Sequence, residues 1–133
     1  MEYSKLAALA AEAAGSAYAP YSGYQVGAAL LTKEGKVYLG CNIENAAFSP
    51  TICAERTALF KAVSEGEREF AAIAVAGGKN GIIEDIFPPC GVCRQALSEF
   101  CPADMPVLLV KKDGFAQTTL GELLPMSFRL KEK

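Results

Sequence analysis

Two uninterrupted apolar segments, residues 70–76 and 106–110, constrain the fold of this chain more than any other feature. A strand that is apolar on both of its faces must be covered on both, which is typical of a sheet lying between two layers of helices. Segments with helical spacing alternate with these strands. We therefore expect one α/β domain over residues 1–133, with a mixed five-stranded sheet in a three-layer α/β/α arrangement.

The remaining elements follow from spacing and turn residues. Apolar residues at helical spacing predict helices over residues 6–17, 51–63, 90–100 and 120–124. A hairpin is predicted from strands at residues 24–32 and 36–41, and a short last strand at 115–119. We expect loops over residues 42–50 and 77–81.

Composition limits the partners of this chain. It has 13 Lys and Arg against 15 Asp and Glu, a net charge of −2, and no long basic stretch. Nucleic acids and anionic membranes are bound through clustered Lys and Arg, so we expect a small-molecule partner instead. The sequence shows neither a signal peptide nor a run of about 18 apolar residues, so we expect a cytoplasmic protein with no membrane contact.

The residue types that are present restrict the chemistry as well. The chain contains no histidine, which excludes Ser-His-Asp and Cys-His catalysis and metal sites built on imidazole. It contains five cysteines, and clustered cysteines in a reducing cytoplasm more often bind metal or act in catalysis than form disulfides.

Three of the cysteines stand where helices are predicted to begin. Cys53 is placed at the start of the second helix, and Cys90 and Cys93 at the start of the third. Thiolates are the metal-binding form, and a helix N-terminus lowers the pKa of a cysteine. Two helices aimed at one point would present three sulfurs to one zinc ion and leave its fourth tetrahedral position for water, as in catalytic zinc sites.

Two charged residues follow Cys53 directly. Glu55 reaches the same point only if its helix points end-on at the metal, where its carboxylate is placed for proton transfer. Three thiolates and Zn²⁺ sum to −1, which favours a cation nearby. Arg56 lies in a first helical turn, where a cation is disfavoured, and this position is explained if its guanidinium offsets the charge of the sulfurs.

The motif Cys53-Ala54-Glu55, followed by Pro89-Cys90-Gly91-Val92-Cys93, resembles the zinc-deaminase signature. Further segments are similar to the small homotetrameric cytidine deaminases, namely residues 19–22, 26–30, 40–46, 53–58, 93–95 and 122–125. The resemblance implies hydrolytic deamination of cytidine and 2′-deoxycytidine with one zinc per chain. It also implies pyrimidine salvage and a homotetramer whose sites are shared between subunits.

The resemblance also implies residue roles. Cys53, Cys90 and Cys93 would bind zinc, and Glu55 would carry protons to N3 and to the leaving amine. The backbones of Ala54 and Cys90 would contact the base, and Asn42 and Glu44 the 3′-hydroxyl of the sugar. Phe128 would stack on the base in a neighbouring subunit's site. Tyr24 stands where relatives often have Phe, and we expect it in the pocket wall; Phe48 stands where they often have Tyr.

Other interpretations remain at this point. Cys90 and Cys93 alone are also compatible with a redox dithiol. Cys41 or Cys101 as a fourth ligand would make the zinc structural instead of catalytic. Two alternative functions are a deaminase for another aminated heterocycle, such as a nucleoside antibiotic, and a zinc-stabilised binding module without turnover.

Overall fold

The computed structural model describes residues 1–130 and contains four α-helices, one 3₁₀ helix and five strands. Their order along the chain is α1 (Tyr3–Ala13), η1 (Ala14–Ser16), β1 (Tyr24–Thr32), β2 (Val37–Cys41), α2 (Ala54–Ser64), β3 (Phe70–Lys79), α3 (Gly91–Phe100), β4 (Pro106–Lys111), β5 (Gly114–Thr119) and α4 (Leu120–Leu123). Every predicted helix and strand is found.

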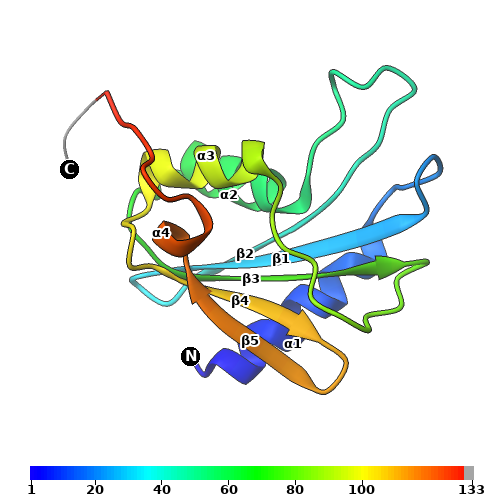
Figure 1. Ribbon diagram of the computed structural model, residues 1–133, viewed down its shortest axis with the longest axis horizontal. Coiled ribbons are helices and arrows are strands. Elements are labelled where there is room, and N and C mark those ends of the chain that lie inside the picture. Colours follow the sequence, from blue (N-terminus) through cyan, green and yellow to red (C-terminus); the bar gives the residue numbers. More distant parts are fainter. Residues whose placement is uncertain (131–133) are drawn as a thin grey trace.

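The five strands form one sheet in the order β2-β1-β3-β4-β5 (Figure 1). The β1 strand pairs antiparallel with both β2 and β3, and β4 pairs antiparallel with β5. The β3 and β4 strands are parallel, with Ala74 opposite Leu108. A parallel pair needs a crossover connection, and α3 supplies it. The mixed five-stranded sheet of the sequence prediction is therefore confirmed.

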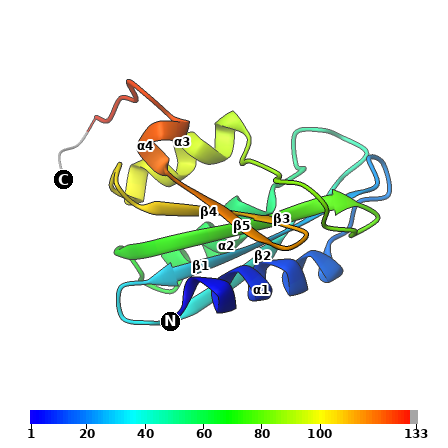
Figure 2. The ribbon, with the colours of Figure 1, turned by 60° about the horizontal axis from the view of Figure 1, so that its bottom comes forward.

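Helices cover both faces of the sheet (Figures 1 and 2). On one face α1 packs against β1 and β3, with Leu6 and Ala10 fully buried against Ala74. On the other face α2 and α3 bury Leu59 and Leu97 in a larger core. Because β3 and β4 lie between the two layers, their side chains are buried on both sides, as the apolar runs predict.

Several boundaries differ from the prediction. The first helix, predicted over residues 6–17, is α1 over Tyr3–Ala13, and the short 3₁₀ helix η1 follows it over Ala14–Ser16. The second helix begins at Ala54 and not at residue 51, because Ile52 instead forms an antiparallel bridge with Ile43. The β3 strand continues to Lys79 through part of the predicted 77–81 loop, with Gly78 paired to Gln25. A Cβ at Gly78 would overlap the Ile82 carbonyl, so this glycine permits a close backbone approach as well as a turn.

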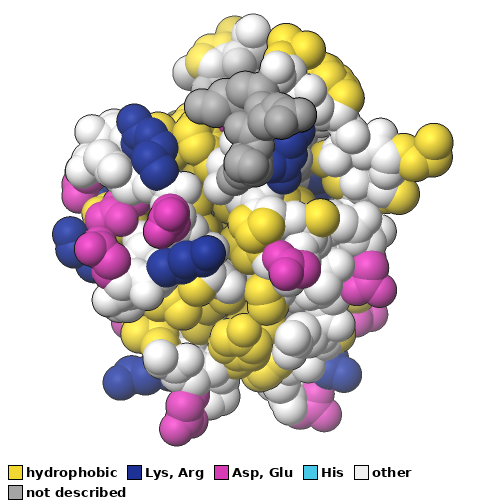
Figure 3. Space-filling view, turned by 90° about the vertical axis from the view of Figure 1, so that its left-hand side faces the viewer, with side chains coloured by type: hydrophobic (Ala, Val, Ile, Leu, Met, Phe, Trp, Pro, Cys, Tyr) yellow, Lys and Arg dark blue, Asp and Glu magenta, His cyan; other side chains and the backbone are white. Residues whose placement is uncertain are grey.

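The exposed charges are mixed in sign. On the face shown in Figure 3, basic and acidic side chains are interspersed among apolar ones and do not gather into one basic tract. None of the helices within residues 1–130 combines the length and the apolar character that crossing a membrane requires.

Candidate metal centre and substrate pocket

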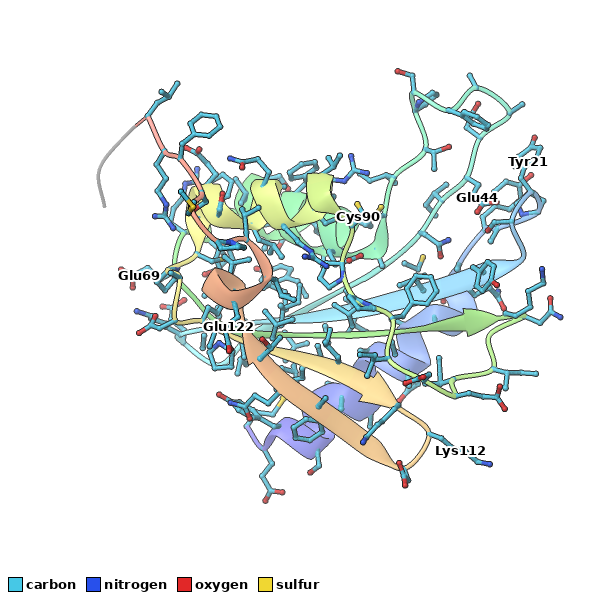
Figure 4. The ribbon with its side chains drawn as sticks, in the orientation of Figure 1. Tyr21, Glu44, Glu69, Cys90, Lys112 and Glu122 are labelled. Carbon is cyan, nitrogen blue, oxygen red and sulfur yellow. The ribbon has the colours of Figure 1, made fainter. Side chains whose placement is uncertain are left out.

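The two cysteine segments meet at the N-terminal ends of α2 and α3. Cys53 is the N-cap residue of α2, Cys90 is the N-cap residue of α3, and Cys93 lies in the first turn of α3. The N-terminal ends of the two helices lie side by side above the sheet. Cys53 and Cys90 are therefore in contact although they are 37 residues apart in the sequence. Figure 4 shows Cys90 at this meeting point.

The three sulfurs are spaced as ligands of one tetrahedral ion. The Cys53 and Cys90 sulfurs are 3.6 Å apart, and those of Cys90 and Cys93 are 3.5 Å apart. Zn–S bonds of about 2.3 Å place two sulfurs of a tetrahedron roughly 3.8 Å apart, so this donor set fits zinc. Within residues 1–130, the cluster of ligand atoms lying within 4.8 Å of one another includes neither Cys41 nor Cys101.

The guanidinium of Arg56 contacts the cysteine sulfurs. Its Nη2 donates to the Cys53 sulfur at 3.4 Å, and the group also interacts with Cys93. The Nε is buried without an acceptor among residues 1–130. Hydrogen bonds from Cys93 and from Arg56 lower the pKa of Cys53, whereas the bond to Cys53 and burial raise the pKa of Cys93.

Glu55 is buried beside the sulfurs. The residue lies in the first turn of α2 and is only 3% exposed, and burial raises the pKa of its carboxyl group to about 7. A carboxyl group with a pKa near neutrality can both accept and donate a proton, which general acid–base catalysis requires. Cys53, the N-cap residue of α2, and Glu55, in its first turn, line the same pocket, so the N-terminal end of α2 faces that pocket.

A pocket opens directly over this group. It has a volume of about 100 Å³ and is lined by Val26, Asn42, Cys53, Ala54, Glu55, Phe87, Pro88 and Cys90. Val26, Phe87 and Pro88 line this pocket although they were not predicted as site residues. The rigid Phe87-Pro88-Pro89 run immediately before Cys90 was the available signal, because proline fixes the backbone at such an edge.

Asn42 and Glu44 hold the backbone around the pocket. The amide of Asn42 accepts from the Val26 N–H and donates to the Tyr24 carbonyl, both at 2.8 Å. The Glu44 carboxylate accepts from the backbone N–H groups of Tyr21 and Ser22 and from the Ser22 hydroxyl. Both side chains keep unused hydrogen-bonding capacity, since an amide has two N–H groups and a carboxylate about four acceptor positions.

A second, outer pocket lies on the Glu44 side. It has a volume of about 310 Å³ and is lined by Tyr21, Ser22, Glu44, Asn45, Phe48 and Thr51. Glu44 lies beside Tyr21 there, at the turn that precedes β1 (Figure 4). Tyr24 is 44% exposed, and its ring contacts Phe87 of the inner pocket at a centroid distance of 5.8 Å.

Phe128 is not brought to this site within one chain. It is 68% exposed, and its neighbour Arg129 donates to the carbonyl of Cys101, the C-cap residue of α3. Cys90 caps the opposite end of that ten-residue helix, about 15 Å away at 1.5 Å per residue. Figures 1 and 4 show the C-terminal segment at the end of α3 that is remote from Cys90.

Three thiols and a buried carboxyl at paired helix N-termini, over a mixed sheet, are typical of zinc-dependent deaminases as a class. The comparisons agree with this class. The family model for the cytidine and deoxycytidylate deaminase zinc-binding region matches residues 1–109. The chain belongs to the cytidine and deoxycytidylate deaminase family, and it is therefore a zinc-binding hydrolytic enzyme.

Individual relatives are similar over almost the whole chain. A cytidine deaminase of Sporosarcina psychrophila is 50% identical over 129 residues, which cover 96% of this chain and 92% of the relative. One from Halalkalibacterium halodurans is 53% identical over 120 residues, covering 90% and 88%. A crystal structure of cytidine deaminase from Burkholderia pseudomallei has 45% identity and a TM-score of 0.88, covering 96% of this chain and 100% of that one.

Proposed function

We propose that the chain catalyses hydrolysis of cytidine and 2′-deoxycytidine to uridine and 2′-deoxyuridine, releasing ammonia, with zinc held by Cys53, Cys90 and Cys93. The observation that carries this proposal is the convergence of three sulfurs, with that of Cys90 at 3.6 and 3.5 Å from the other two and buried Glu55 beside them. Zinc bound there would supply the Lewis acidity that activates water toward the pyrimidine ring. Arg56 offsets the negative charge of the sulfurs.

Glu55 carries the protons in this proposal. Water adds to C4 of the base, and one of its protons passes through Glu55 to N3. A second proton passes through Glu55 to the amino group, which leaves as ammonia when the C4–N bond breaks. A pKa of about 7 suits both directions of transfer near neutral pH. Burial of the carboxyl group is the physical cause of that pKa.

The two pockets would bind different parts of the substrate. The flat base would occupy the inner pocket, against the backbones of Ala54 and Cys90, and the sugar would point outward along Asn42 and Glu44. The free capacity of these two side chains would take up the 3′-hydroxyl, and the negative charge of Glu44 would disfavour a phosphate there. Tyr24 supports the wall through Phe87.

The assembly proposed is a cytoplasmic homotetramer of single-domain chains that acts in pyrimidine salvage; of the predicted domain, residues 131–133 lie outside the described residues. Phe128, exposed and remote from Cys90 in its own chain, would close the site of a neighbouring subunit by stacking on the base. The net charge of −2 and the mixed charge of the face in Figure 3 favour a free nucleoside over a nucleic-acid strand, which would need basic contacts.

The test follows ultraviolet absorbance of the purified protein with cytidine and 2′-deoxycytidine, with ammonia and zinc per chain measured on the same sample. Conversion to the uridine products, one ammonia per turnover and about one zinc per chain are the expected results. Zinc without turnover would instead indicate a zinc-stabilised binding module. Faster turnover of an aminated nucleoside antibiotic in direct competition would indicate a deaminase for another heterocycle.

A further inference from the structure

Arg94 connects two segments that are far apart in the sequence. Its Nε donates to the carbonyl of Pro89 at 2.8 Å, and its Nη1 donates to the carbonyl of Leu123 at 2.7 Å. The first carbonyl belongs to the residue directly before Cys90. The second belongs to the last residue of α4. One guanidinium therefore joins the Cys90 segment to the C-terminal part of the chain.

The two bonds to the carbonyls explain why an arginine stands near the start of α3. Arg94 is the fourth residue of α3 and its own N–H bonds the carbonyl of Cys90, but it lies next to the unpaired N–H groups of the first turn, which make a cation unfavourable. Helix stability does not explain a half-buried arginine at this place. Two backbone carbonyls accept from it, and a planar guanidinium holds both in one fixed geometry, which lysine cannot do.

The α4 end of the connection is itself held firmly. Thr119 and Glu122 form a reciprocal capping box at the start of α4, and the Leu120 N–H bonds the Met105 carbonyl at 3.0 Å. The helix thereby stays attached to β5 and to the start of β4. Figures 1 and 2 show α4 beside α3, and Figure 4 places Glu122 on it.

We propose that Arg94 is a positioning residue that anchors the Pro89–Cys90 peptide to α4, so that the Cys90 sulfur is held at the spacing that zinc requires. Cys90 needs such an anchor because its side chain is exposed and the residues before it form a loop, whereas Cys93 is fixed by the buried face of α3. This proposal rests on the zinc site proposed above and adds a residue that does not touch the metal.

The expected effect is a weaker metal site. Partners that orient metal ligands typically contribute about 10- to 100-fold in metal affinity when removed. Arg94→Met keeps the length of the side chain but loses both donors, so we expect zinc affinity to fall within that range. Arg94→Lys keeps the charge and one donor, and we expect a smaller fall.

Arg68 provides a matched control. Its Nη1 also donates to two backbone carbonyls, those of Val63 and Glu67, but both lie within its own segment at the end of α2. Arg68→Met therefore removes an equal number of arginine–carbonyl bonds without touching the Cys90 segment. We expect its zinc affinity to stay within about twofold of the unaltered protein, since it lies outside the set of residues that orient the ligands.

Zinc affinity is measured by competition with a chromophoric chelator, on the unaltered chain and on all three variants. Deuterium uptake at residues 120–124 is measured with and without zinc. We expect zinc to lower uptake there in the unaltered protein and to have no such effect in Arg94→Met. If Arg94→Met does not fold, the same two measurements on Arg94→Lys decide the question.

Two results would overturn the proposal: an Arg94 variant that binds zinc as tightly as Arg68→Met, or zinc-dependent uptake at residues 120–124 that the substitution leaves unchanged. Failure of the unaltered chain to bind zinc would be a different outcome, because it contradicts the proposed function itself.

Discussion

The chemistry proposed for Glu55 depends on its burial. Glu55 is 3% exposed and lies beside three sulfurs, and burial raises the pKa of its carboxyl group to about 7. The group of possible ligand atoms consists of the three cysteine sulfurs and does not include Glu55. Glu55→Gln keeps the shape of the side chain and removes its proton transfer. We therefore expect kcat for cytidine to fall by about 100-fold or more while zinc per chain is unchanged.

Steady-state kinetics and metal analysis check this prediction. Glu12→Gln, on the exposed side of α1, is the matched control and should change neither quantity. Retention of more than a tenth of the activity would contradict the proton-carrier role, and loss of zinc would make Glu55 part of the metal site.

The pKa of the Glu44 carboxyl group depends on Ser22. Hydrogen bonds from the hydroxyl and the N–H of Ser22 lower the pKa of Glu44. A folded-state pKa below the unfolded value stabilises the fold above the unfolded pKa, and this contribution is lost as pH falls through the folded pKa. Ser22→Ala should raise the titration midpoint of the Glu44 carboxyl carbon in NMR, and Ser64→Ala, whose hydroxyl bonds the Lys61 carbonyl, should not. Equal midpoints in all three proteins would refute the link.

At the scale of elements, two glycines let the helices approach the sheet. A Cβ at Gly27 of β1 would overlap the backbone of Ala10 in α1, and one at Gly40 of β2 would overlap that of Ala54 and Ala58 in α2. These close backbone contacts, one on each face, fix the distances of α1 and α2 from the sheet. The position of Cys53, the N-cap of α2, therefore depends on Gly40.

Substitution of these glycines should separate stability from metal binding. Gly27→Ala and Gly40→Ala should each lower the free energy of unfolding by about 1–3 kcal/mol, because both overpack a tight contact. Only Gly40→Ala should also weaken zinc binding, since α1 carries no part of the site. Urea unfolding and chelator competition check this, with Gly15→Ala, which meets nothing within 4 Å, as the control. Equal loss of zinc affinity in both variants would contradict it.

At the scale of the whole molecule, zinc at the proposed site would connect α2 to α3. Metal bound only by the folded chain stabilises it, by about 2.7 kcal/mol at a free concentration 100 times its Kd. We expect chelation to lower the melting temperature by several degrees. Cys53→Ala should show a melting temperature that no longer responds to zinc, whereas Cys41→Ala, outside the ligand cluster, should respond as the unaltered chain does. A zinc response in Cys53→Ala would remove Cys53 from the ligand set.

The proposed role of Phe128 also concerns the whole molecule, because this residue would act in the site of another subunit. Mixed oligomers of Phe128→Ala and Glu55→Gln chains contain some sites in which both residues are intact. With equal, random mixing, about a quarter of the sites should be active, although each variant alone has little activity. The mixture is checked by mass spectrometry before its activity is measured. No recovery in verified mixed oligomers would count against a shared site.

Local signals in the sequence determined the elements and the chemistry of the centre. Apolar runs and helical spacing predicted every strand and helix, because periodicity is a property of neighbouring residues. The signature around Cys53 and Cys90 predicted the three sulfurs and Glu55, which the structure brings together. The ends of elements were predicted less well, since the bridge of Ile52 with Ile43 and the pairing of Gly78 with Gln25 are contacts across the chain.

Only the tertiary structure decided which side chains meet. Packing against the sheet brings together segments that are far apart in the sequence. Three features depend on this packing: the place of Phe87 in the pocket, the bond from Ser22 to Glu44, and the connection of Pro89 to Leu123 through Arg94. Apart from the Phe87-Pro88-Pro89 run before Cys90, the sequence has no local period or spacing that relates these residues. Long-range contacts are set by the direction of each side chain once the layers are packed, and that direction exists only in the folded molecule.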